Sequence, residues 1–418
     1  MYGTPHSLKK VLSALSMYCN KLLLGSISIG LIIQIGLLVV HYTGAPLPYA
    51  LLDAVKYQEQ AVDFAQHYFE TGTLPYVVAT GSTLYIALIG SLYIIFGVAE
   101  FIPVILNLLL WIGLIVVVYA LTSELTRNTT APYLAAFGTA LFPPILLYSV
   151  ILQRDSLVLF FTALSVYALV RWMNKPTGWL MAISLGSLAV VGLFHFGVVI
   201  IGAVHVAVFL FYESSRERWV LFDSGHLLRE VVVKVVLVTV FAVLAVSLFS
   251  TKLSSEPLPA LLSRHLDGVA WSGRAVYLEE LRPASLIDVG LQTPVRMAYF
   301  LFAPYPWEIQ QPLDLLGVGV SVAYAALLVL AVWATLRRKG SERTRGLVLL
   351  AMVVLFVAVF AWGTSNYGTS FRHKSKIVWV LISLASVGIA GSPWFQHLHH
   401  AVVRGWGRCA GIMRRPRS

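Results

Sequence analysis

Residues 101 to 121 read FIPVILNLLLWIGLIVVVYAL, an apolar stretch without a single charged side chain. Its length matches the roughly 20 residues that an α-helix needs to cross the hydrocarbon core of a bilayer. Comparable apolar runs cover 22–40, 157–170, 231–249, 315–336 and 347–362, and weaker ones cover 131–149, 178–194, 196–212 and 376–391. The sequence therefore predicts an all-α polytopic membrane protein with about ten transmembrane helices.

The composition supports the same class of protein. Hydrophobic residues make up 58% of the 418 residues and charged residues only 12%, whereas a soluble globular chain carries roughly a quarter charged residues. No repeat, low-complexity tract or flexible linker divides the chain, so we expect one membrane domain over 1–418. The first apolar run is longer than the core of a secretory signal, about 7 to 15 residues, and is expected to remain as an anchor.

The distribution of Lys and Arg predicts the orientation. The segment 81–97 is apolar but short, and whether it crosses decides the side of every later segment. If it does not cross, the cytoplasmic segments hold 20 of the 30 Lys and Arg; if it does, they hold 12. Because cytoplasmic segments are rich in positive charge, we expect 81–97 to be a re-entrant or interfacial helix on the outer face. Both termini would then be cytoplasmic, with outer loops at 42–100 and 251–312.

The first outer loop contains a predicted amphipathic helix, ALLDAVKYQEQAVDFAQHYFETG, at residues 50–72. Spacings of three or four residues put its polar side chains on one stripe: Asp53, Lys56, Gln60, Asp63, His67 and Glu70. Another face holds Leu51, Val55, Val62, Ala65 and Phe69. Gly72 can end the helix in the left-handed conformation. We expect the distal charges Asp63, His67 and Glu70 to form a solvated face. Asp53 lies in the first turn, where the helix macrodipole favours the ionised carboxylate. An ionised carboxylate at the rim of the membrane can act as a base.

A second acidic site follows the run 131–149, where Pro143 and Pro144 should break the helix. The next residues, YSVILQRDS, bring Arg154 and Asp155 to the outer rim of the membrane. Asp155 could be functional or could simply cap the helix that begins near Leu157. His195, between two apolar runs on the same side, is either catalytic or structural.

The later outer segments add cations and aromatic residues. Arg296 precedes AYFLFAPYPWE, in which Pro304 and Pro306 prohibit a regular helix, so we expect a membrane-entering loop. Its candidate site residues are Tyr305, Trp307 and Glu308, although aromatic side chains there could also be interfacial anchors. The stretch SNYGTSFRHKSK (365–376) is expected to form a short polar loop that binds an anion such as a lipid phosphate, or a solvated loop. Its candidate residues are Asn366, Arg372, His373, Lys374 and Lys376.

Residues 20–215 resemble the GT-C class of membrane glycosyltransferases, which includes protein O-mannosyltransferases and the aminoarabinose transferase of lipid A. In that class an acidic residue precedes a tyrosine on an amphipathic helix after the first span, matched here by Asp53 and Tyr57. A Pro-led helix ending in Phe-Gly follows, similar to LPYVVATGSTLYIALIGSLYIIFG (74–97), and a second acidic residue matches Asp155 in QRDS. The outer-face helices would span 50–97, and 216–418 would form a C-terminal transmembrane module.

The resemblance implies transfer of a sugar from a polyprenyl-phosphate carrier to a glycan, lipid or protein acceptor on the outer face of a bacterial inner membrane. This chemistry would serve surface polysaccharide or glycoconjugate synthesis. Asp53 and Asp155 would be catalytic, and the other candidates would bind substrate: Tyr57, Arg154, His195, Arg296, Tyr305, Trp307, Glu308, Asn366, Arg372, His373 and Lys374. Some enzymes of the class use a divalent metal, but no ligand spacing here argues for one.

The sequence contains no Gly-rich strand-turn-helix unit that could bind a nucleotide sugar. A glycosyl donor would therefore have to arrive within the membrane. Lipids are therefore expected partners, and nucleic acid is not, because the basic residues are scattered between apolar runs. Two alternatives stay open. A polysaccharide polymerase or ligase would use a lipid-diphosphate donor, and a transporter or flippase would need polar residues near the middle of its spans.

Overall fold

The computed structural model describes residues 21–44, 47, 53–77, 81–212, 257–270 and 276–397. This part of the chain is helical, and its only β-type pairing is an isolated bridge between Val276 and Asn366. In chain order the helices are α2 (Lys21–Tyr42), α3 (Asp53–Thr71), α4 (Gly81–Phe96), α5 (Phe101–Leu125), α6 (Ala131–Leu141), α7 (Pro143–Val150), α8 (Asp155–Asn174), α9 (Gly178–Phe194), η1 (Phe196–Ile201), α10 (Gly202–Phe211), α12 (Leu258–Ala270), α13 (Leu286–Phe302), η3 (Pro306–Glu308), α14 (Pro312–Arg337), α15 (Gly340–Trp362) and α16 (Tyr367–Ala390).

Six of these helices are long and apolar enough to cross a membrane: α2, α5, α8, α14, α15 and α16. The bent pair α6 and α7 makes a seventh if it is one broken span, and α4, α9 and the η1–α10 segment are shorter apolar helices. Nine of the ten expected runs thus have a helical counterpart, and the tenth, 231–249, lies outside the described residues. The described chain is an all-α polytopic membrane protein.

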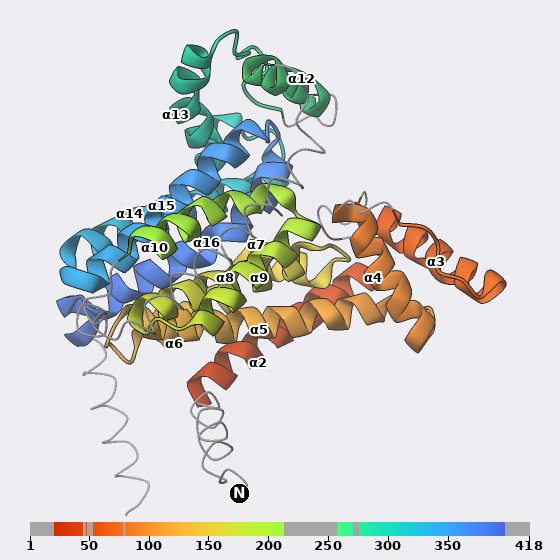
Figure 1. Ribbon diagram of the computed structural model, residues 1–418, viewed down its shortest axis with the longest axis horizontal. Coiled ribbons are helices and arrows are strands. Elements are labelled where there is room, and N and C mark those ends of the chain that lie inside the picture. The colour runs from red at the N-terminus through yellow and green to blue at the C-terminus, as the bar shows by residue number, and fades with distance from the viewer. Residues whose placement is uncertain are drawn as a thin grey trace, which may run out of the picture.

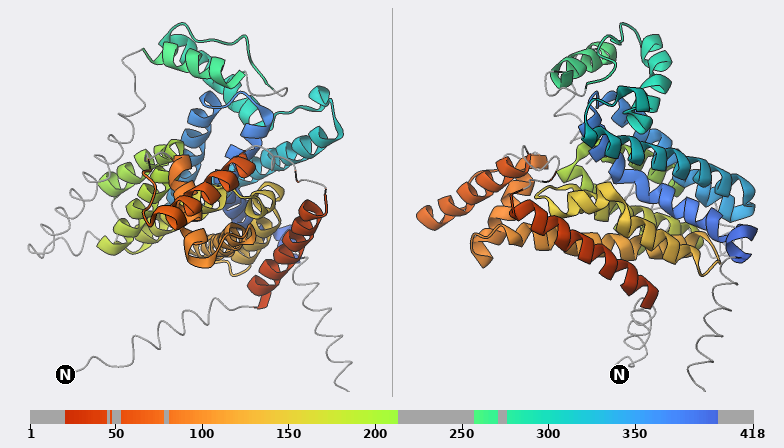
Figure 2. Two further views of the ribbon diagram at one scale, coloured as in Figure 1. Left: turned by 90° about the vertical axis from the view of Figure 1, so that its right-hand side faces the viewer. Right: turned by 180° about the vertical axis from the view of Figure 1, so that it is seen from behind.

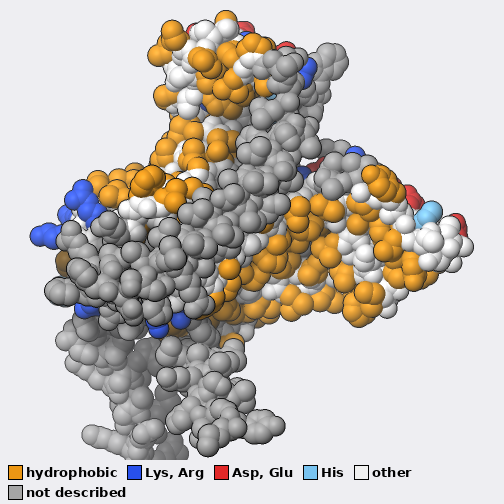
Figure 3. Space-filling model, in the orientation of Figure 1, with side chains coloured by type: hydrophobic (Ala, Val, Ile, Leu, Met, Phe, Trp, Pro, Cys, Tyr) orange, Lys and Arg blue, Asp and Glu red, His pale blue; other side chains and the backbone are white. Residues whose placement is uncertain are grey.

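The long helices run side by side in one bundle, with α3 and α4 at one end and α12 and α13 standing off one flank (Figures 1 and 2). Hydrophobic side chains cover much of the visible flank (Figure 3). On α2, for example, Ile32 and Ile35 are more than half exposed. An apolar exterior of this extent is unfavourable in water but suits lipid. At the centre, α16 is buried along most of its length and packs against α14 and α6.

The expected outer helix forms as α3, and Gly72 follows it with a φ of +70° and donates its N–H to Tyr68 O at 2.9 Å. Two residues of the predicted apolar face, Val55 and Phe69, are exposed. The buried side chains are Ala65, which belongs to that face, and Tyr57, Ala61 and Phe64, which do not. The physical reason is that α4 packs along this stripe, which recurs at helical spacing.

Two breaks in the chain follow from proline, as expected. The helix 131–149 divides at Phe142, just before Pro143 and Pro144, and its two parts meet at 54°. Near residue 302, α13 ends before Pro304, and only the short η3 interrupts the path to α14.

Segment 81–97 forms α4, which packs against α3 at the end of the bundle (Figure 1).

One expected loop is a helix. Residues 365–376 were expected to be a short polar loop, but α16 begins at Tyr367 and includes all four basic residues of that segment. Asn366 caps the helix, because its side chain accepts hydrogen bonds from the backbone N–H groups of Gly368 and Thr369. The basic side chains therefore lie in the first turns of the central helix, where they face packed neighbours.

Candidate functional site

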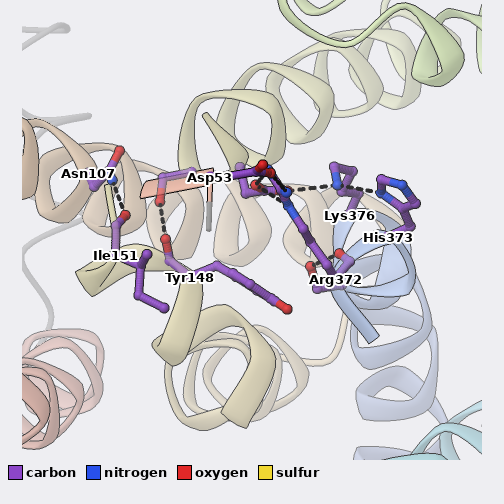
Figure 4. A network of polar contacts seen from close by, with 10 residues as sticks. Asp53, Asn107, Tyr148, Ile151, Arg372, His373 and Lys376 are labelled. Carbon is purple, nitrogen blue, oxygen red and sulfur yellow. Dashed lines mark hydrogen bonds and ion pairs between the residues drawn. The ribbon is translucent and has the colours of Figure 1, made fainter. Parts of the chain in front are cut away.

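Arg372 joins two carboxylates that are far apart in the sequence. Its Nη1 lies 2.7 Å from Asp53 Oδ2, while its Nη2 lies 2.6 Å and its Nε 2.7 Å from Asp155 Oδ2 (Figure 4). The three residues begin or lie near the beginning of α3, α8 and α16. Planar, charged contacts of this kind are short and directional. The guanidinium therefore fixes where both carboxylates sit.

Lys376 completes the charge pattern around Asp155. Its Nζ lies 2.7 Å from Asp155 Oδ1, and both side chains are fully buried. One turn separates Lys376 from Arg372 on α16, so the two cations share a helix face. Lys376 also contacts His373, with 2.8 Å between Nζ and Nδ1. A buried carboxylate held by two cations is strongly fixed in place, since breaking a buried ion pair leaves an uncompensated charge.

The segment before α8 delivers Asp155. Residues 151–153 are buried, and the Asn107 side chain donates a hydrogen bond to Ile151 O at 2.9 Å (Figure 4). The helix begins at Asp155 itself, two residues earlier than expected, and no side-chain cap is formed. The Asp155 carboxylate faces Arg372 and Lys376. The structure therefore does not support the alternative in which Asp155 only caps the helix.

Asp53 differs from Asp155 in its exposure. It is the first residue of α3, and 49% of its side chain is accessible, against 0% for Asp155. Tyr57 lies one turn further on, buried with its ring edge-on to Tyr85 at 5.4 Å. Burial raises the pKa of the Tyr57 hydroxyl, which keeps it protonated. Of the two carboxylates, Asp53 is the one that a solvent-borne or lipid-borne molecule can reach.

Arg154, the residue directly before α8, lies against the beginning of α4 beside the same group. A side chain at Gly81 would place its Cβ 2.6 Å from Arg154 Nη1 and 2.3 Å from the backbone oxygen of Phe194, so only glycine fits there. Charges that act on the Tyr57 hydroxyl come from Arg154, Asp53, Arg372 and Asp155. Arg154 forms no ion pair with any described residue. Three cations, including Lys376, therefore face two carboxylates.

His195 and His373 lie side by side behind this group. Their ring centroids are 5.2 Å apart, and Phe360 contacts both rings. Burial lowers the pKa of His195, and the positive charges of Lys376 and Arg154 lower it further. His195 is therefore neutral at physiological pH. A neutral imidazole can accept or donate a hydrogen bond without adding to the positive charge.

Two predicted cations lie elsewhere. Arg296 is fully buried in α13, where its guanidinium stacks on Trp362 at 4.3 Å and donates a hydrogen bond to Leu281 O. Lys374 points to another side of α16, where its Nζ donates to Leu301 O and to Ser321 Oγ, each at 3.1 Å. Neither of these two cations forms an ion pair with Asp53 or Asp155, the described carboxylates of the Arg372 group. The structure therefore does not bring these two residues to it.

The aromatic candidates form a separate stack. Tyr305 and Trp307 are parallel, with 4.9 Å between ring centroids, and Tyr305 meets Tyr299 edge-on at 5.3 Å. Glu308 accepts the backbone N–H of Tyr305 at 2.8 Å. Asn366 caps α16. These residues lie near the beginning of α16 but make no direct contact with Asp53, Asp155 or Arg372 in the described chain.

The sequence indicated Lys376 only as one member of a basic segment and gave it no role of its own. The signal that would have found it is local: an Asn cap at 366 starts a helix, and positions 372 and 376 then share a face. Among the described residues, no three His, Cys, Asp or Glu side chains converge as a metal site would require. The group is thus a carboxylate and cation cluster.

No protein-family model and no curated protein sequence matches the chain. Among solved structures, the chain is similar to ArnT from Cupriavidus metallidurans, in a crystal structure with undecaprenyl phosphate bound. The two are 15% identical, with a TM-score of 0.46, and the match covers 86% of this chain and 63% of that chain. The chain thus spans less than two thirds of the length of that protein. A likeness this distant assigns no function, which has to be argued from the side chains.

Proposed function

We propose that this protein is a membrane glycosyltransferase that moves a sugar from a polyprenyl-phosphate carrier to an acceptor on the outer face of the membrane. The observation that supports it best is the bridge of Arg372 between the accessible Asp53 and the buried Asp155. A base that an acceptor can reach thus stands next to a group with surplus positive charge. Such a pair suits a reaction in which a hydroxyl loses a proton while a phosphate departs.

The proposed reaction assigns a role to each group. Asp53 takes the proton from the acceptor hydroxyl as its oxygen forms a bond to the anomeric carbon of the sugar. The bond from that carbon to the phosphate oxygen breaks, and the lipid phosphate leaves with the bonding electrons. Arg154 and Arg372 stabilise the negative charge on the departing phosphate, as fixed cations do in a water-poor site. Asp155, itself held by Lys376, keeps Arg372 in position.

The position of the cluster supports a lipid-borne donor. Asp155 and Arg372 belong to the first turns of α8 and α16, both candidate membrane spans. Charges at such helix ends that face the bundle interior are typical of substrate sites. A phosphate carried at the membrane surface could reach them without a soluble nucleotide-binding domain. Surface polysaccharide or glycoconjugate synthesis is the process that this chemistry would serve.

The test uses purified protein in nanodiscs and a panel of polyprenyl-phosphate sugars carrying a hexose, an N-acetylhexosamine or a pentose. Solubilised envelope glycans, lipids and proteins serve as acceptors, and release of polyprenyl phosphate is the readout. Asp53→Asn keeps the size and can still accept a hydrogen bond from Arg372, but it cannot take a proton at neutral pH. We expect it to lower release by a factor on the order of 100 while donor binding survives.

Asp63→Asn is the matched control, because Asp63 is exposed on the same helix and has no ion pair with a described residue. It should leave release unchanged. Full activity in Asp53→Asn would remove Asp53 as the base. Turnover of polyprenyl-diphosphate sugars alone would instead indicate a polymerase or ligase. If no donor of either kind binds or turns over, the protein is not a glycosyltransferase of this type and transport becomes the better hypothesis.

A further inference from the structure

A polar cavity lies at the opposite end of α16 from Arg372. It has a volume of about 480 Å³ and lies where α14 and α16 end, beside the connection between α5 and α6. Arg372 and Gly388 are separated by a length of helix that spans roughly 24 Å, at 1.5 Å per residue. A neighbouring cavity of about 390 Å³ shares Arg127 and Asn128 with it. The cavity of about 480 Å³ is therefore distinct from the cluster around Arg372.

The lining is more positive than negative. Three arginines and one glutamate face the cavity: Arg127, Arg337, Arg338 and Glu342. Arg338 is already engaged, because it contacts Glu342 at 3.0 Å and donates to Val387 O at 3.1 Å. Arg337 lies over the Trp333 ring at 4.5 Å. Neither Arg337 nor Arg127 forms an ion pair with a described residue, so two guanidinium groups remain available to an anion.

The position of the cavity along the bundle indicates which class of anion could reach it. Three candidate spans, α5, α14 and α16, end beside it at Leu125, Arg337 and Ala390. Ends of spanning helices lie at the level of lipid headgroups, where Trp is also enriched. Part of the wall is apolar, formed by Trp333, Ala334 and Pro393. A ligand with a charged head and an apolar continuation would match both parts of the lining.

Glycines at the end of α16 let the end of α14 pack closely against it. A Cβ at Gly391 would lie 3.0 Å from Arg338 Nη2, and one at Gly388 would lie 2.7 Å from Ala334 Cβ. The cavity is also too large for a single small ion, since a water molecule occupies about 30 Å³. We infer that it binds the headgroup of an anionic phospholipid, with Arg127 and Arg337 holding the phosphate. Basic pockets between transmembrane helices are known to bind lipids in this way.

The experiment titrates phosphatidylglycerol onto the purified full-length protein in detergent and measures retained lipid by native mass spectrometry. The double variant Arg127→Gln with Arg337→Gln should raise the apparent Kd by roughly 25-fold, because each cation near an anionic headgroup contributes about a fivefold change. The matched control, Lys339→Gln with Arg343→Gln, removes the same charge from exposed positions at the same end of α14 and α15. It should bind like the wild type.

Three outcomes would overturn the inference. Equal weakening in both double variants would indicate diffuse charge attraction and no built site. Equal retention of phosphatidylcholine would show that the negative headgroup charge is not recognised. Displacement of the lipid by inorganic phosphate at equal concentration would identify a free-anion site. Because the readout is lipid binding, failure here leaves the proposed sugar transfer untouched, and loss of transfer in Asp53→Asn leaves this site untouched.

Discussion

The guanidinium of Arg372 makes three contacts with carboxylates at the candidate site. Arg372 reaches Asp155 through Nε and Nη2 and Asp53 through Nη1. A lysine at the same place would keep the charge but has one ammonium on a flexible stem, which cannot hold two carboxylates in a fixed relation. Charge and geometry at this position can therefore be separated by substitution.

We expect Arg372→Lys to lower kcat for sugar transfer by roughly tenfold or more while the KM for the donor changes little. The reason is that positive charge for the phosphate survives, whereas the orientation of Asp53 is lost. Arg372→Ala should lower kcat and raise the KM together. Steady-state release of lipid phosphate at varied donor concentration measures both constants.

Arg343→Lys, an exposed change at the other end of the bundle, is the control and should match the wild type. A donor KM that rises in Arg372→Lys while kcat stays constant would mean that Arg372 binds the donor through its planar geometry and does not orient Asp53.

At the scale of elements, the sequence predicts those helices whose signals are local. The first turn of α3, its end at Gly72 and the break at Pro143 all follow from residue type and spacing. The beginning of α16 was missed because a cluster of four basic residues reads as solvent-exposed, although Asn366 supplies a cap. Tertiary contacts decide here: Asp155 compensates two of those cations.

The candidate site itself could be predicted residue by residue but not as a constellation. Asp53, Asp155 and Arg372 each had a local reason to be singled out. Their meeting joins positions 217 and 319 residues apart in the chain, which no helical period encodes. Arg296 and Lys374 were equally plausible from their charge, and their different helix faces and packing take them elsewhere.

The contact between α4 and the end of α9 gives an element-scale test. Gly81→Ala would drive a Cβ to 2.3 Å from the Phe194 backbone oxygen, an atom that cannot move aside as a flexible side chain could. We expect a loss of about 1 to 3 kcal/mol in unfolding free energy, the usual cost of overpacking. Donor turnover should fall as well, because Arg154 Nη1 lies against the same spot. Denaturant titration in micelles measures the stability.

Gly186→Ala in α9 is the matched control, since a Cβ there meets nothing within 4 Å. It should be neutral or slightly stabilising, because alanine favours a helix more than glycine does. Equal stability of Gly81→Ala and the wild type would mean that α4 can shift at little cost, and Gly81 would then have no part in placing Arg154.

At the scale of the whole molecule, charge separates along the bundle. Lys and Arg side chains gather at the end where α14 and α15 meet, while acidic side chains appear at the far tip of α3 (Figure 3). The turn between α14 and α15 holds a dense group of cations: Arg337, Arg338, Lys339 and Arg343. Positive charge marks the cytoplasmic side of membrane proteins. This asymmetry predicts that α3 and the Arg372 cluster face outward.

The orientation can be tested with single cysteines in a chain from which the two native ones, Cys19 and Cys409, are replaced by serine. Gln66 lies on α3 and Ser341 at the start of α15, and both positions are exposed. Helix α3 and the turn between α14 and α15 lie at opposite ends of the bundle (Figure 1). A membrane-impermeant maleimide should label the Gln66→Cys variant in intact cells and the Ser341→Cys variant only after permeabilisation. Equal labelling of both in detergent controls for reactivity. The reverse pattern in intact cells would put Asp53 on the cytoplasmic side, where an outer-face acceptor cannot reach it, and the proposed transfer would then have to use a cytoplasmic acceptor.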